Sequence, residues 1–71
     1  MDQEERAKLK VLLEYWIKHN REHGEEFEEW SERARGLYGG VVSSGLIEAR
    51  DCMLKASQSL SRVMERLRAD Q

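Results

Sequence analysis

Apolar side chains recur through the first half of the chain in alternating steps of four and three residues. The pattern runs without a slip from Leu9 to Leu37, and only Asn20 and His23 interrupt it with polar side chains. Such alternation is typical of a long helix that lies along a partner helix. The full series is Leu9, Leu13, Trp16, Asn20, His23, Phe27, Trp30, Ala34 and Leu37.

The first helix is predicted to span about residues 3–37. Asp2, followed three residues later by Glu5, resembles a capping box. The unbroken phase through Gly24 favours one continuous helix, roughly 50 Å long at 1.5 Å per residue. An alternative interpretation breaks the helix between residues 20 and 24, with Asn20 as an N-cap.

Glycines at positions 36, 39 and 40 end this pattern, because glycine adopts the left-handed conformation that closes a helix. We therefore expect a glycine turn over about residues 38–43 and a second helix over about residues 44–69. Ser43 or Ser44 is the expected N-cap, and an earlier helical start at Val41 stays open.

The second helix carries its own apolar series, with small residues at its middle. Folded back on the first helix, it sets Ala49 opposite Trp30 and Ala56 opposite His23, so large and small side chains interdigitate. The polar segment 57–59 then lies across from Asn20. The series is Leu46, Ala49, Met53, Ala56, Leu60, Val63 and Leu67.

The 71 residues are enough for one small domain, an all-α antiparallel hairpin of two long helices spanning residues 1–71. A lone hairpin leaves one side of each apolar series, including both tryptophans, partly exposed to water. Small helical domains often complete their cores by associating. We therefore expect a homodimer that forms a four-helix bundle. The expected interface residues are Leu13, Trp16, Phe27 and Trp30.

Charge and cysteine content limit the expected binding partners and cellular compartment. The net charge is −2, and basic residues are interspersed with acidic ones, which argues against nucleic-acid binding. No apolar run is long enough to cross a bilayer, and the acidic first residues do not resemble a secretion signal. A single cysteine, Cys52, excludes an internal disulfide and favours a reducing compartment. We expect a cytoplasmic protein without nucleic-acid or membrane partners.

The two histidines, His19 and His23, lie one helical turn apart and therefore point the same way. This is the spacing of a helical metal pair, and Glu26 lies a turn further on. The three side chains would hold a transition metal such as zinc, or two hairpins would each lend a histidine pair across a dimer axis. The structural alternative is a hydrogen-bonded core His23 with a half-exposed His19 beside it.

Asn20 and His23 form the expected buried polar layer, which costs stability but penalises wrong registers and wrong oligomers. The segment 19–23 also fits the H-x-x-E-H pattern of inverted zinc peptidases. A chain this short lacks room for their distant third ligand and substrate cleft. No serine has identifiable oxyanion donors. The sequence therefore predicts a non-enzymatic protein.

The segment from Leu12 to Phe27 resembles a small, uncharacterised prokaryotic family of short helical proteins with an LLExWIxHNxxHxxEF core. Its members often carry a further histidine before the tryptophan, where this chain has Tyr15. The resemblance covers about the first half of the chain. It implies an association with metal handling in anaerobic microbes, with nickel among the metals, and it supplies no enzyme activity. Nickel and zinc are therefore the candidate cofactors.

Two functions fit these features. The first is a self-associating helical protein whose central layer of His19, Asn20 and His23 binds a transition metal or fixes the assembly. The second is an adaptor or regulator that docks a helix of another protein on its apolar series.

Overall fold

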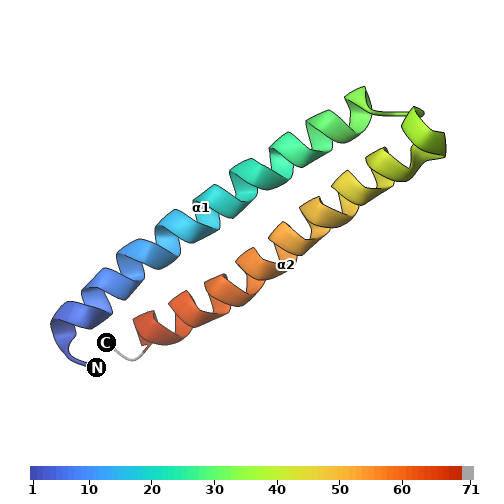
Figure 1. The fold of residues 1–71 in the computed structure, drawn as a ribbon. Coiled ribbons are helices and arrows are strands. Elements are labelled where there is room, and N and C mark those ends of the chain that lie inside the picture. Colours follow the sequence, from blue (N-terminus) through green and yellow to red (C-terminus); the bar gives the residue numbers. More distant parts are fainter. Residues whose placement is uncertain (70–71) are drawn as a thin grey trace.

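The structure is a computed structural model that describes residues 1–69, so the last two residues of the predicted domain lie outside it. Helix α1 spans Gln3–Arg33, the short 3₁₀ helix η1 spans Leu37–Gly40, and helix α2 spans Val41–Ala69. Figure 1 shows α1 and α2 antiparallel and side by side, joined by the turn at one end. The predicted all-α hairpin is confirmed, as a rod of 52 × 14 × 14 Å.

Helix α1 begins at Gln3, where a side-chain cap closes its first turn. Asp2 is extended, and its Oδ1 accepts a hydrogen bond from the Glu5 N–H at 2.8 Å. This bond satisfies one of the N–H groups that the first turn leaves free. The helix then runs without interruption through Gly24. The alternative break with Asn20 as an N-cap is therefore absent.

Helix α1 ends four residues earlier than the predicted residue 37. The Ala34 N–H donates to the Trp30 carbonyl at 2.9 Å, and Gly36 follows with a left-handed φ of +89°. A residue in that conformation does not continue a right-handed helix. Leu37 therefore lies in η1, although it keeps the spacing of the apolar series.

The turn also ends earlier than predicted, and α2 begins at Val41 instead of residue 44. Tyr38, Gly39 and Gly40 all have positive φ, at +51°, +67° and +91°. The left-handed conformation costs a non-glycine residue such as Tyr38 about 1 kcal/mol. Because the chain turns within these residues, the two serines expected as caps already lie inside α2.

The interior of the hairpin is small. Among the described residues, the buried apolar side chains are Leu13, Ala34 and Met64, and Leu13 alone of the large ones is fully buried. Ser31 and Gly24 on α1 are also buried. We call the line of contact between the two helices the seam; on α1 it consists mostly of small residues.

The seam keeps Leu13 and Ala34 of the predicted apolar series but is displaced by one residue at its two tryptophan positions. Trp16 and Trp30, expected in that series, are 38% and 55% exposed. The residues that follow them, Ile17 and Ser31, lie in the seam instead. Between these two positions α2 approaches α1 closely at Gly24, where an added β-carbon would contact two side chains of α2. On α2, Met64 likewise takes the place predicted for Val63, which is 44% exposed.

A β-carbon added at Gly24 would lie 3.6 Å from Arg50 Cγ and 3.9 Å from Met53 Cβ. These are ordinary van der Waals distances, so α2 already occupies the space that a larger side chain would need. Nearby, Arg50 Nη1 pairs with Glu28 Oε1 at 3.4 Å. The contacts agree with the antiparallel register expected from the sequence.

The free end of the hairpin is tied together by polar contacts between its helices. Arg6 Nη2 donates to the Leu67 carbonyl at 3.0 Å, and Arg68 Nη2 lies 3.9 Å from Glu14 Oε1. The latter pair is largely exposed, and such pairs contribute at most about 1 kcal/mol. The Arg6 bond satisfies a carbonyl in the last turn of α2, which has no partner within its own helix.

Replacing Leu13 by alanine is expected to lower the free energy of unfolding by about 2–5 kcal/mol, because it leaves a cavity at the centre of the seam. Val11→Ala truncates an apolar side chain that is 66% exposed, so its effect should stay within about 0.5 kcal/mol. Urea unfolding followed by circular dichroism measures both. Equal losses would contradict the position of the seam.

Candidate functional site

Four rings spaced four residues apart form a ladder on α1, which we call the ring ladder. Tyr15 stacks on His19 with 5.2 Å between ring centroids, His19 meets His23 edge-on at 4.3 Å, and His23 stacks on Phe27 at 5.9 Å. Residues four apart lie one above the other on a helix. The stacking of Tyr15 on His19 was not predicted, although the spacing of four residues between positions 15, 19, 23 and 27 indicates that these side chains share one face of the helix.

The two histidines meet through their ring nitrogens. His23 Nε2 lies 2.9 Å from His19 Nε2, a distance at which one nitrogen must donate its proton and the other accept it. His19 is exposed and His23 half-buried. Two Nε2 atoms that converge on one point can both bind one metal ion when each ring carries its proton on Nδ1, because the unprotonated nitrogen of a neutral imidazole is a metal ligand.

Glu26 does not complete this pair within one hairpin. In the part of the chain that the structure describes, no group of three or more His, Cys, Asp or Glu side chains is placed to hold a metal ion. A protein site for a transition metal supplies three or four ligands. The expected set of His19, His23 and Glu26 is therefore not assembled within one hairpin.

The expected polar layer is not one hydrogen-bonded unit. Asn20 is half-buried, but its amide forms no hydrogen bond with any residue from 1 to 69. Across the seam, Ser57 Oγ is buried and also lacks a partner among those residues. His23 instead bonds to His19 on the ring ladder. Asn20 and His23 are thus both half-buried, but no hydrogen bond joins their side chains.

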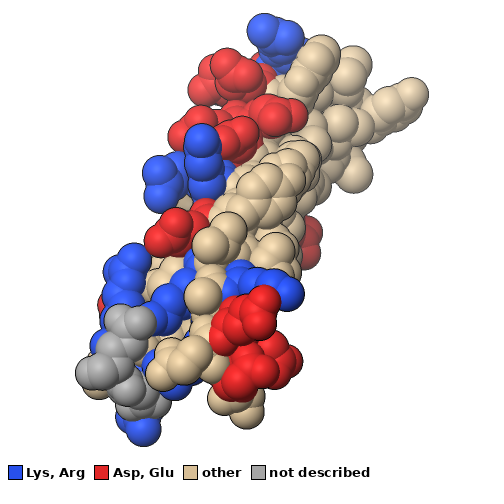
Figure 2. Space-filling view, turned by 90° about the vertical axis from the view of Figure 1, so that its left-hand side faces the viewer, with Lys and Arg blue, Asp and Glu red and all other residues tan. Residues whose placement is uncertain are grey.

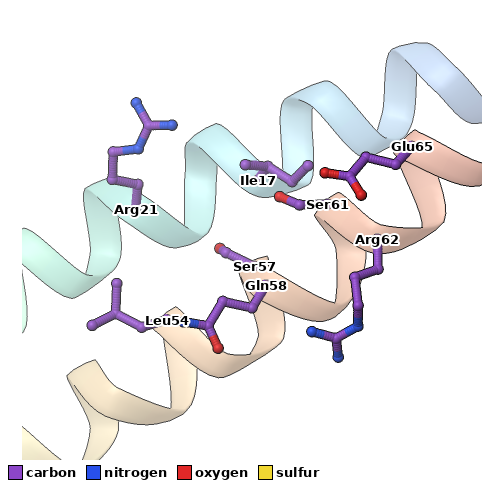
Figure 3. A pocket seen from close by; sticks show the side chains of 8 residues that line it. All are labelled: Ile17, Arg21, Leu54, Ser57, Gln58, Ser61, Arg62 and Glu65. Carbon is purple, nitrogen blue, oxygen red and sulfur yellow. The ribbon is translucent and has the colours of Figure 1, made fainter. Parts of the chain in front are cut away.

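A polar groove opens between the helices beside Ile17. Figure 3 shows the Ser57 and Ser61 hydroxyls directed into it, while Arg21 and Arg62 extend away from it in opposite directions. Because the two guanidinium groups do not converge, this groove is not built to bind an anion. It also lies away from the ring ladder, since Arg21 and His23 are two residues apart and point to opposite sides of α1.

The histidine pair lies in the middle of an uncovered stripe. Leu12, like the two tryptophans, is partly exposed to solvent, at 44%. The guanidinium carbon of Arg33 lies 4.9 Å from the centroid of the Trp30 ring. Figure 2 shows an uncharged strip that runs along the molecule between charged side chains. We call the following residues, which repeat in steps of four, three, four and seven, the outer stripe: Leu12, Trp16, His19, His23 and Trp30.

Comparison with known proteins gives one match. A family model described as a domain of unknown function (DUF8180) matches residues 9–67. No curated protein and no solved structure matches the chain. The matched range includes most of both helices, so the family extends beyond the histidine segment on which the sequence resemblance rests. Within residues 1–69, neither helix has the length and apolarity needed to cross a bilayer.

Ser57→Ala is expected to raise the free energy of unfolding by up to about 1 kcal/mol, because it removes a buried hydroxyl that has no partner. The matched control is Ser59→Ala, since Ser59 is exposed and accepts a hydrogen bond from Arg62 at 3.0 Å. Both variants gain the same helix propensity, so the difference between them reports the buried hydroxyl of Ser57 together with the exposed bond that Ser59 loses. A Ser57→Ala variant less stable than the control would contradict this account.

Proposed function

The chain belongs to the DUF8180 family, and we propose that it is a non-enzymatic, self-associating helical protein that binds a transition metal through His19 and His23. The observation that carries the proposal is the outer stripe. Two imidazoles lie nitrogen to nitrogen at its middle, on an apolar surface that the hairpin itself leaves uncovered.

Self-association is supported by the surface area of the hairpin. Its accessible surface is 5541 Å², whereas a compact monomer of 8.4 kDa exposes about 4,600 Å². The excess is close to the area of about 800 Å² that each partner buries in a stable interface. A second copy packed on the outer stripe would remove this excess and produce a four-helix bundle.

Pairing also supplies what the metal site lacks. Each hairpin contributes His19 and His23, so two hairpins bring four imidazole ligands, the number in a closed tetrahedral zinc site. The indole rings on either side would shield the site from water, and such an apolar shell controls solvent access to a bound metal. Zinc and nickel both accept imidazole nitrogen.

Cys52 bears on where such a protein would work. Its thiol is exposed and free. In an oxidising compartment, exposed thiols on two copies tend to be linked into a disulfide. We therefore propose a reducing, cytoplasmic setting in which the thiol stays free.

Sedimentation equilibrium is expected to give twice the mass of one chain. Trp16→Glu should raise the dimer dissociation constant at least tenfold, because it buries an unpaired charge in the interface. Val11→Glu adds the same charge outside the outer stripe and should leave the dimer unchanged. A protein that stays monomeric at millimolar concentration would contradict self-association and favour the second function, an adaptor that docks a partner's amphipathic helix on the same stripe.

Excess Ni²⁺ or Zn²⁺ is expected to raise the melting temperature of the untagged protein, since a ligand present at 100 times its Kd stabilises the folded state by about 2.7 kcal/mol. His19→Ala and His23→Ala should each abolish the gain, while Glu26→Gln should keep it. Differential scanning calorimetry measures the shift. An unchanged melting curve, or a gain that survives loss of either histidine, would refute metal binding at this pair.

A further inference from the structure

The outer stripe carries one tryptophan on each side of His23, at the same separation along the helix. Trp16 lies seven residues before it and Trp30 seven residues after it. Seven residues are two turns, or about 10.5 Å along a helix, so the indoles flank the imidazole at equal distances on one side of α1. A surface with this symmetry matches a second copy of itself that is turned end for end.

Charge is distributed unevenly along the same helix. Residues 3–21 carry five basic side chains and three acidic ones, whereas residues 22–33 carry six acidic side chains and one basic one. When two copies of α1 lie antiparallel, the basic half of each faces the acidic half of the other. Opposite charges across an interface fix its orientation and suppress the alternatives. A parallel pair of α1 helices would bring like charges together.

From these two observations we infer that the protein pairs with a second copy of itself in antiparallel orientation, with the α1 helices in contact and a two-fold axis at His23. The inference rests on the proposed self-association and adds its geometry. Each Trp16 then lies against the partner's Trp30. The two His23 rings meet at the axis with a His19 one turn to either side, so the metal half-sites join in a cluster that neither chain holds alone.

The alternative is a dimer whose axis runs along the helices. Each α1 would then lie opposite the partner's α2, where its rings would meet small residues such as Ala49 and Ala56. The histidine pairs of the two copies would lie on diagonally opposed helices. The two arrangements differ most at the turn, because the antiparallel dimer places the two turns at opposite ends and the alternative places them at the same end.

The experiment is a spin-label distance measurement on the dimer. Tyr38 lies in the turn and is 83% exposed, so Tyr38→Cys in a Cys52→Ser background accepts a label without disturbing the helices. The antiparallel dimer is expected to give about 30 Å or more between labels, because the ten residues of α1 beyond His23 add about 15 Å on each side of the axis. Turns at the same end would give less than about 20 Å, two helix diameters.

A label at Lys55, near the middle of α2, is the control, since its distance differs little between the two arrangements and reports that the labelled dimer forms. A short distance at residue 38 in a dimer would overturn the antiparallel geometry and leave self-association standing. Absence of any dimer would refute the proposed function and this inference with it. Salt is an independent readout, because screening of the opposite charges across the interface should weaken the antiparallel dimer severalfold.

Discussion

The close approach of the two helices along small residues of α1 is the constraint on which the rest of the structure depends. Gly24, Ser31 and Ala34 are buried against α2, and even a single added carbon at position 24 would touch two side chains. Close-packed interiors leave no voids for larger groups. The rings of α1 are therefore displaced from the seam to its flank, and this displacement creates the outer stripe.

This constraint also explains how far the sequence predicts the fold. Apolar periodicity indicated the long first helix, and Asp2 marked its start. Periodicity did not separate the two surfaces of α1, because large side chains such as Trp16 and Trp30 follow the outer stripe. The seam is formed in part by Gly24 and Ser31. Neither residue is apolar enough to show in a hydrophobic pattern that it is buried. The same periodicity extended the first helix to Leu37, although left-handed backbone at Gly36 ends it sooner.

The part of the candidate site that depends only on helix geometry was predictable from the sequence. A spacing of four residues indicated that His19 and His23 would meet, and their nitrogens do meet. Glu26, three residues on, was not brought to them, because sequence spacing gives a direction around the helix but not the reach of a flexible carboxylate. For Ser57, the polar segment 57–59 was visible in the sequence. Which of its hydroxyls is buried depends on the seam, and the sequence did not locate the seam.

The bond from Arg6 to the Leu67 carbonyl joins positions separated by 61 residues. Through this bond, a side chain in the first turn of α1 holds the last turn of α2. The final carbonyls of α2 have no partners in their own helix. Loss of the Arg6 side chain would therefore leave the Leu67 carbonyl without this partner and loosen the last turn of α2.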